Sequence, residues 1–432
     1  MELRSKDTVR RGPLAALLLA SIVSWIGNSF TAIAIPWFVL QTTGSAALTG
    51  VAAAFGVLPA IVTGFFGGTL VDRLGYKRSS VLADLMSAAT VGAIPLLHAF
   101  DLLGFPVLLT LVLLGAALDV PGYTARGALV PDLAAMARMN LDRANSYMQT
   151  IANLSTLIGP PLAGVMIALL GTSQVLWLDA ASFVFSAVLV GCAVPGAPVR
   201  RIAGATASGG AMASSYLSEM REGLRFVLRD RLVRTMLTMF AAVNVMGAAL
   251  VAVVLPVYAR ESFGQAVGLG LMLSGFGGGS LVGALLYGAL AGRLPRRPTF
   301  LLAFAGLGLP FFALAAEPGL WVSVGLLALV GMANAPIAVI AVSVIQMRTP
   351  PDMRGRVMGM ETALTSIAAP LGPLAGGLAI QWLGVSVTLL VVAAGMVAIP
   401  LLNVANPTLR DLNLQSATEV VSSGAVAEQV AP

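Results

Sequence analysis

Long apolar stretches alternate with short polar ones along almost the whole chain. Each apolar run approaches the roughly 20 residues that an α-helix needs to cross a ~30 Å hydrocarbon core. The expected membrane-spanning helices lie at about residues 13–40, 47–71, 79–99, 104–128, 143–169, 175–194, 235–258, 267–291, 298–316, 319–346, 358–380 and 385–404. The pattern therefore predicts an all-α polytopic membrane protein with twelve transmembrane helices.

One polar interruption, residues 196–232, is much longer than the others. It begins with Pro, Gly and Ser, and continues with Glu and Arg between apolar residues at helical spacing, which predicts an amphipathic helix on the inner membrane surface. This linker separates an N-terminal half, residues 1–195, from a C-terminal half, residues 233–405, each with six predicted helices. The polar tail, residues 406–432, is expected to be disordered and cytoplasmic.

Two motifs occur once in each half. The segment Gly68–Arg78 has a counterpart 220 positions later at Gly288–Arg297, and Gly159–Gly164 has one 213 positions later at Gly372–Gly377. Two repeats at nearly the same offset indicate an internal duplication. Because each half has an even number of spans, both copies enter the bilayer from the same side, as in transporters built from two parallel repeats.

Composition and charge placement agree with this interpretation. With 58% hydrophobic and 10% charged residues and a mean hydropathy of +0.91, the chain cannot form a water-soluble globule. The net charge of +6 could indicate nucleic-acid binding, but 24 of the 25 Lys and Arg residues fall on alternate loops and only Arg260 falls on the opposite set. This positive-inside bias predicts a multi-pass protein of the cell (inner) membrane with both termini cytoplasmic, and no nucleic-acid partner.

Few residues are available for covalent or metal chemistry. The chain has one cysteine, Cys192, and one histidine, His98, which argues against an internal disulfide and a Cys or His metal site. It lacks a Gly-x-x-x-x-Gly-Lys-Ser/Thr phosphate-binding loop and shows no cluster that combines a nucleophile with a base. We therefore expect neither an enzyme nor a nucleotide-driven pump, and no metal or cofactor.

Three motifs resemble those of the major facilitator superfamily, and the likeness extends from the first predicted span to the last. Gly68-x-Leu70-x-Asp72-Arg73-x-Gly75-x-Lys77 is similar to its signature between spans two and three, and Gly159-Pro160-x-x-Ala163-Gly164 is similar to its antiporter motif in span five. Leu129-Val130-Pro131-Asp132-Leu133, followed by Arg143-Ala144-Asn145-Ser146, resembles the macrolide-efflux and siderophore-exporter branch. The chain departs from the family at Tyr76, where Arg is usual, and at Asn28, where relatives often have a carboxylate.

The resemblance implies a monomeric secondary transporter that exports an amphipathic organic compound in exchange for protons by alternating access. An uptake carrier or a lipid or lysolipid flippase of the same fold is the alternative. A membrane enzyme is a remote alternative, because no catalytic cluster occurs in the sequence, and so is a receptor, because the short loops offer little surface for partners. The expected partners are the small-molecule substrate, protons and the lipid bilayer.

Charged residues near the inner membrane face could form a gate. The expected members are Asp72, Arg73, Gly75, Lys77 and Arg126. A carboxylate there can cap the N-terminal end of a helix of the other half, and the cations can reach carboxylates or carbonyl groups. The alternative is that these charges only set the membrane topology.

Two carboxylates are candidates for proton coupling. Asp119 lies well inside span four, where an unpaired carboxylate costs about 2.5–3.5 kcal/mol, so it should either pair or hold a proton. Glu361 lies near the start of span eleven and has an apolar repeat partner, Met148. Asp119 could instead hold an inner-gate arginine, and Glu361 could be a solvated helix start. Asp84 and Asp179 are interpreted as boundary residues near the ends of spans three and six.

A substrate cavity would need aromatic and amide side chains at mid-depth. The candidates are Trp25, Asn28, Tyr147, Asn153, Asn244, Phe276 and Asn334. The Gly-Pro pairs Gly159-Pro160 and Gly372-Pro373 would allow helices to bend and approach closely. Helix packing alone could also account for each of these residues.

Overall fold

The computed structural model describes residues 11–195, 225, 227–290, 293–349, 357, 368–410 and 412. The described residues form two compact units. Of these residues, the first unit contains 11–195 with Gln265–Gly270, and the second contains those from 225 to 264 and from 271 to 412. Most of the expected linker, most of the C-terminal tail and the coupling candidate Glu361 lie outside the described residues.

The described residues are helical, and no strand occurs among them. The first unit contains α1 (Gly12–Thr43), α2 (Ala46–Leu74), α3 (Tyr76–Ala99), α4 (Phe105–Met136), α5 (Leu141–Leu170) and α6 (Thr172–Ala193). The next span consists of α8 (Arg231–Ala249), the π-helix η1 (Leu250–Val254) and α9 (Leu255–Phe263), and it is followed by α10 (Ala266–Leu290), which begins in the first unit. The chain continues with α11 (Arg296–Leu314), α12 (Leu320–Arg348), α14 (Leu371–Leu383), α15 (Val385–Val404) and a short 3₁₀ helix η2 (Pro407–Arg410).

These helices correspond one to one with the predicted spans. Ten stretches among the described residues are long and apolar enough to cross a membrane. The other two predicted spans are represented by the shorter apolar helices Ala46–Pro59 and Leu371–Leu383, both of which adjoin residues whose side chains or backbone are not described. The predicted all-α membrane fold is confirmed. The tail differs from expectation at its start, where η2 forms and Leu409 is buried.

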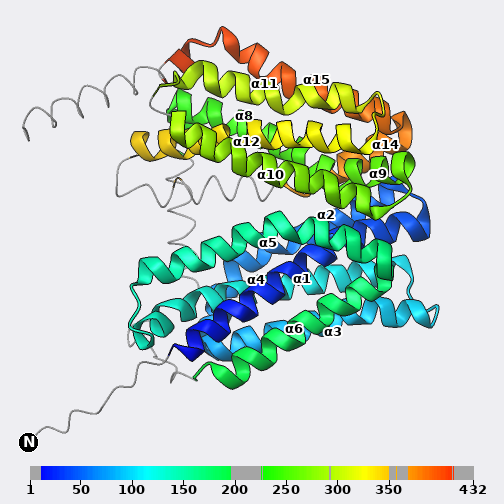
Figure 1. The fold of residues 1–432 in the computed structure, drawn as a ribbon, viewed down its shortest axis with the longest axis vertical. Coiled ribbons are helices and arrows are strands. Elements are labelled where there is room, and N and C mark those ends of the chain that lie inside the picture. The colour runs from blue at the N-terminus through cyan, green and yellow to red at the C-terminus, as the bar shows by residue number, and fades with distance from the viewer. Residues whose placement is uncertain are drawn as a thin grey trace, which may run out of the picture. The chain divides into compact units, whose positions relative to one another are not determined.

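The two units use the same pattern of helix packing. In the first, α3 packs against α4 and α6, and α1 packs against α5 and α6 (Figure 1). In the second, α11 packs against α12 and α15, and α8 packs against α14. In the order of the spans, α8 corresponds to α1 and α14 to α5. Likewise, α11 corresponds to α3, α12 to α4 and α15 to α6. The duplicated sequence motifs therefore belong to duplicated packing units.

One junction repeats with the same 213-residue offset as the Gly-Pro motifs. Gly171 joins α5 to α6 with φ +86°, and Gly384 joins α14 to α15 with φ +79°. In both, the glycine N–H donates to the carbonyl group four residues earlier, Ile167 or Ile380. A positive φ favours glycine because a Cβ would clash with the backbone.

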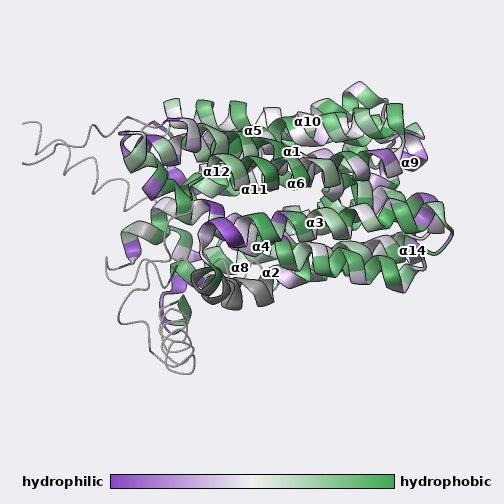
Figure 2. Cartoon of the chain, turned by 90° about the horizontal axis from the view of Figure 1, so that it is seen from below, coloured by the Kyte–Doolittle hydropathy of each residue, from purple (hydrophilic) through white to green (hydrophobic). Residues whose placement is uncertain are grey.

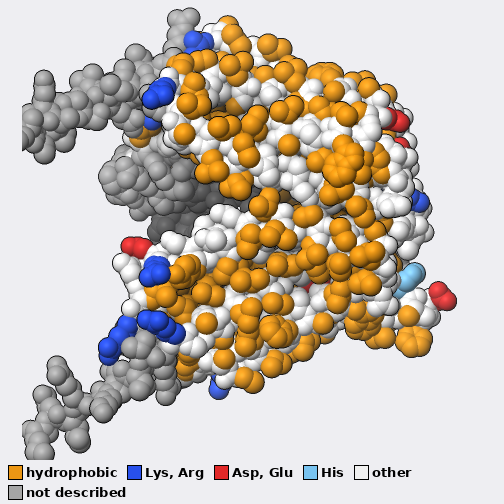
Figure 3. Space-filling view, viewed as in Figure 1, with side chains coloured by type: hydrophobic (Ala, Val, Ile, Leu, Met, Phe, Trp, Pro, Cys, Tyr) orange, Lys and Arg blue, Asp and Glu red, His pale blue; other side chains and the backbone are white. Residues whose placement is uncertain are grey.

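The outer surface of the helices matches lipid rather than water. Large apolar side chains are exposed on both units, including Leu169 at 71%, Leu302 at 71% and Leu402 at 81%. Hydrophobic residues cover the length of the helices, whereas hydrophilic ones concentrate near their ends (Figure 2). Charged side chains likewise gather near the helix ends (Figure 3). This distribution is typical of a protein in a bilayer.

Candidate transport site

Small residues on α1 allow α6 to approach closely. Ser21 and Ser24 are fully buried, and Gly27 follows at the same three-residue spacing. A Cβ added at Gly27 would collide with the side chains of Asp179 and Ser182 on α6. Small residues at such spacing are typical of closely packed membrane helices. The contact brings polar groups of α6 against the backbone of α1.

A buried ion pair joins α3 to α4. Asp84 Oδ1 lies 3.4 Å from Arg126 Nη2, and the side chains of these residues are 2% and 1% exposed. Ser186 on α6 donates a hydrogen bond to Asp84 Oδ2 over 2.7 Å and accepts one from Arg126 Nη1 over 3.4 Å. Removing one partner of such a pair leaves an uncompensated buried charge. Asp84, Arg126 and Ser186 therefore hold three helices together.

A second polar contact joins α1 to α4 beside an aromatic pair. Asn28 Nδ2 donates a hydrogen bond to Asp119 Oδ2 over 3.0 Å, and both residues are half-buried. One turn away on each helix, the rings of Trp25 and Tyr123 lie 5.5 Å apart between centroids at an interplanar angle of 33°. The predicted cavity residues Trp25 and Asn28 thus meet the predicted coupling residue Asp119 and its neighbour Tyr123.

A third polar group joins α1 to α6. Asp179 is fully buried, and it accepts hydrogen bonds from the hydroxyl groups of Thr31 on α1 and Ser182 on its own helix. The Ser182 Oγ to Asp179 Oδ1 distance is 3.1 Å. The carboxyl group of Asp179 is therefore held by neutral donors, whereas that of Asp84 is held mainly by a cation.

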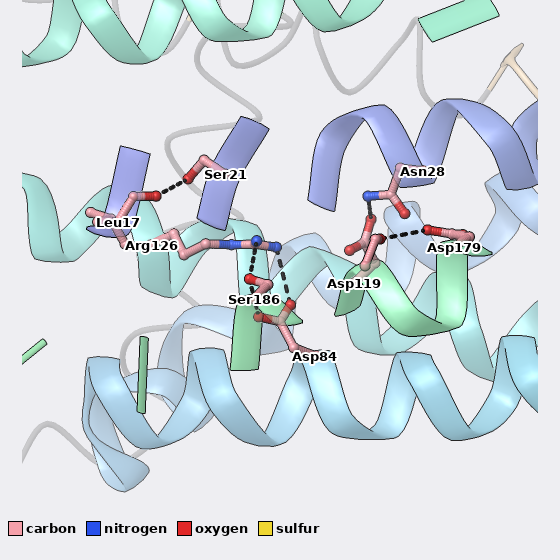
Figure 4. A network of polar contacts seen from close by, with 9 residues as sticks. Leu17, Ser21, Asn28, Asp84, Asp119, Arg126, Asp179 and Ser186 are labelled. Atoms are coloured by element: carbon pink, nitrogen blue, oxygen red, sulfur yellow. Dashed lines mark hydrogen bonds and ion pairs between the residues drawn. The ribbon is translucent and has the colours of Figure 1, made fainter. Parts of the chain in front are cut away.

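These three polar groups occupy two depths of the same bundle: the ion pair lies at one, and the Asn28–Asp119 contact and the Asp179 group lie at the other (Figure 4). Asp119 and Arg126 are seven residues apart on α4, which corresponds to about 10 Å along the helix axis at 1.5 Å per residue. Asp179 and Ser186 have the same separation on α6. We call the ion pair, the Asn28–Asp119 contact and the Asp179 group the polar row; its residues come from α1, α3, α4 and α6.

Helix α5 carries a polar face that its own unit does not cover. Tyr147 and Asn153 are both exposed, as are their hydrogen-bond partners Arg143 and Gln149. Arg143 Nε donates to the Tyr147 hydroxyl over 3.0 Å, and Gln149 Nε2 donates to Asn153 Oδ1 over 3.1 Å. Uncovered polar groups in a spanning helix need water or ligand contact. This face is therefore a candidate for the wall of an aqueous cavity.

The candidates in the second unit are half-buried. Asn244 on α8, Phe276 on α10 and Asn334 on α12 all have this intermediate exposure. Asn244 Nδ2 donates to the carbonyl oxygen of Phe240 over 3.0 Å, within its own helix. Among the residues that the structure describes, no hydrogen bond or ring contact joins Asn244, Phe276 and Asn334 into one group.

The Gly-Pro motifs lie at close helix contacts in both units. A Cβ at Gly159 on α5 would collide with Ser29 on α1, and one at Gly372 on α14 would collide with the Val245 carbonyl oxygen on α8. Pro160 lies inside α5, and Pro373 is buried within the first turn of α14. The motifs thus bring equivalent spans together.

The gate candidates are described only in part. Asp72 and Arg73 lie in the last turn of α2, and their side chains are not described. Gly75 joins α2 to α3 with φ +84°, and Lys77 is half-buried in the first turn of α3. Arg126 is buried in the interior of the first unit instead of lining an inner rim.

Two residues of the polar row were misjudged from the sequence. The interpretation of Asp84 and Asp179 as boundary residues is wrong, because they are 1% and 0% exposed inside the helix bundle. The available signal was their position within the apolar runs, since ionisable residues in a spanning segment usually pair or function. Within the described residues, no group of three or more His, Cys, Asp or Glu side chains could hold a metal ion.

Comparisons with known proteins agree with the fold. The family described as transmembrane secretion effector matches residues 8–432. The multidrug efflux pump Tap of Mycolicibacterium fortuitum is 34% identical over 411 residues, which cover 94% of this chain and 98% of that protein. Macrolide efflux protein A of Streptococcus pyogenes is 25% identical over 374 residues, covering 84% and 88%. The crystal structure of the nucleoside transporter NupG superposes with a TM-score of 0.73 at 12% identity, covering 90% of this chain and 98% of that one.

Proposed function

This chain belongs to the transmembrane secretion effectors of the major facilitator superfamily, and we propose that it exports amphipathic organic compounds in exchange for protons. As a family member it is a multi-pass membrane transporter of small molecules and not an enzyme. Its similarity to Tap and to macrolide efflux protein A supports drug-like substrates, such as lipophilic cations or macrolides.

The observation that carries the proposal is the aromatic pair beside the Asn28–Asp119 contact. The Trp25 and Tyr123 rings lie within one turn of this half-buried carboxyl group. Aromatic faces bind apolar groups and organic cations, and a nearby carboxylate adds charge attraction. If the cation and the proton compete for Asp119, binding one releases the other, which is the requirement for exchange.

In this proposal the other predicted residues keep distinct roles. Asp72, Arg73, Gly75 and Lys77 form the inner gate at the junction of α2 and α3. Both termini lie in the cytoplasm, as the distribution of cations indicates. Glu361 remains a second coupling candidate, and the protein works as a monomer.

The polar face of α5 in the first unit and the half-buried residues of the second unit are further candidates for substrate contact, each within its own unit. Tyr147 and Asn153 supply hydrogen-bonding groups on the first unit, and Asn244, Phe276 and Asn334 supply amide and aromatic groups on the second. Sparse polar groups among apolar ones suit a ligand that is mostly apolar.

The test uses purified protein in liposomes loaded with tetraphenylphosphonium. An imposed proton gradient should drive the cation against its own gradient in the wild type. Asp119→Asn should abolish this gradient-driven transport at any cation concentration. Exchange of labelled for unlabelled cation needs no net proton movement, so it should persist once the cation concentration is raised to offset the lost charge attraction. Exposed Asp132 on the same helix provides the matched control, Asp132→Asn.

Two results would contradict the proposal. Wild-type transport of tetraphenylphosphonium and erythromycin that ignores the proton gradient would exclude proton exchange. Movement of a fluorescent lysolipid, without movement of either drug, would instead identify a flippase.

A further inference from the structure

The buried carboxyl group of Asp179 has no part in the function proposed above. It is 0% exposed, and its hydrogen bonds come from the hydroxyl groups of Thr31 and Ser182. A buried carboxylate without a cation is expensive in a bilayer, so a function or a bound proton is needed to explain it.

The helices packed against α6 bring few charges near Asp179. α6 packs against α1, α3 and α5. α1 has no charged residue, α3 contributes only Asp84 to the interior, and α5 carries its charges, Asp142 and Arg143, in its first turn. α4 adds Asp119, which lies at the same depth of the bundle as Asp179, and Arg126, which is bound to Asp84.

The polar row therefore contains three carboxyl groups and one guanidinium group. Arg126 balances the negative charge of Asp84 alone. Asp119 and Asp179 are therefore two neighbouring carboxyl groups whose charges it does not balance. Two like charges at short range in a low dielectric repel strongly, and a proton on one of them removes the repulsion.

The hydrogen-bond partners decide which carboxyl groups can hold a proton. Arginine can only donate, so its partner Asp84 is satisfied as a carboxylate. A hydroxyl group can both donate and accept, so Thr31 and Ser182 can serve Asp179 either ionised or protonated. An amide also has both functions, so Asn28 can serve Asp119 in both states.

We propose that Asp179 is a second proton-binding residue, which receives a proton from Asp119 and returns it during the transport cycle. In the transfer, the O–H bond at Asp119 breaks and one forms at Asp179, leaving Asp119 ionised to hold the cationic substrate. The inference deepens the proposed proton exchange and rests on it, because Asp119 is the donor.

Infrared spectroscopy of the purified protein tests the proton on Asp179 without any transport measurement. The carbonyl band of a protonated carboxyl group should appear and disappear in a pH titration. Asp179→Asn should remove one such band, and Asp119→Asn should remove a different one. Asp132→Asn, at an exposed position, should leave both bands in place. A wild-type spectrum that matches Asp179→Asn at every pH would overturn the proposal.

Two milder variants test the proposal even if Asp179→Asn does not fold. Thr31→Val and Ser182→Ala keep the carboxyl group and remove one hydrogen bond each, so they should shift the frequency of the Asp179 band and leave the Asp119 band unmoved. Unshifted bands in both variants would overturn the assignment.

A measurement of proton release distinguishes a failure of this inference from a failure of the proposed function. In unbuffered detergent solution, tetraphenylphosphonium should release protons from Asp179→Asn and fewer from the wild type, because Asp179 of the wild type takes up the proton that Asp119 gives away. Equal release from both proteins would contradict the role of Asp179. If neither protein releases protons, proton exchange itself is wrong, whereas the infrared bands still report on Asp179.

Discussion

The side-chain amide of Asn28 on α1 donates a hydrogen bond to Asp119 on α4 over 3.0 Å, across 91 positions of sequence. The contact connects an amide of the first membrane-spanning helix with the carboxyl group proposed to exchange protons. An amide satisfies the carboxyl group without adding a second negative charge.

Asn28→Leu should slow proton-driven transport about tenfold to a hundredfold, because a hydrogen bond to an ionised group is worth about 1.5–3 kcal/mol. The ionised form of Asp119 loses its donor, while the apolar packing of α1 is kept. Initial rates of tetraphenylphosphonium transport in liposomes measure the effect. Asn28→Gln retains an amide and should be less impaired, and equal rates in the leucine variant and the wild type would refute the role of the contact.

Tyr123→Leu should weaken tetraphenylphosphonium binding by roughly twofold to thirtyfold, since a cation–π contact contributes about 0.5–2 kcal/mol. Tyr123→Phe keeps the ring that stacks on Trp25 and should bind almost as well as the wild type. Calorimetric titration of the purified proteins gives the affinities. Equal losses in both variants would show that the hydroxyl group, and not the ring, matters.

Asp84→Asn should lower stability by about 3–5 kcal/mol, because it leaves the buried guanidinium group of Arg126 without a counter-charge. Thermal unfolding in detergent should show a large fall in the midpoint temperature. The exposed Asp132→Asn variant should unfold like the wild type. Adding Arg126→Gln to Asp84→Asn should recover part of the loss, and a double variant less stable than the single one would contradict the pairing.

Gly279→Ala should lower stability by about 1–3 kcal/mol, because its new Cβ would collide with the backbone of Ala328 on α12. The adjacent Gly278 has no atom within 4 Å of such a Cβ, so Gly278→Ala should be neutral or gain up to about 1 kcal/mol from better helix propensity. Thermal unfolding of the pair isolates the packing effect from the change of residue. Equal midpoint temperatures for the two variants would contradict a tight contact between α10 and α12.

Several parts of the fold could be predicted because they depend on local properties. Hydropathy alone places the helices, since any segment in lipid must satisfy its own backbone groups. The 213-residue repeat of Gly-Pro also appears in the structure as equivalent helix contacts, at Gly159 with Ser29 and at Gly372 with Val245. The junction glycines Gly171 and Gly384 share the offset, but their positive φ angles became visible only in the structure.

The sequence predicted several residues of the candidate site, but not which of them contact one another. The sequence identified Asp119, Asn28 and Trp25 as polar or aromatic residues at mid-depth, because such residues stand out in apolar runs. It could not pair Asn28 with Asp119, and it assigned Asp84 and Asp179 to span ends, although both are buried.

The sequence by itself determined the membrane fold, the number of spans and the duplication, because hydropathy and glycine positions act within single segments. The tertiary structure alone decided that Arg126 pairs with Asp84, that Asn28 donates to Asp119, and that the hydroxyl groups of Thr31 and Ser182 donate to Asp179. Those partners come from helices far apart in sequence. Which charge is balanced in a medium without water depends on how these helices pack.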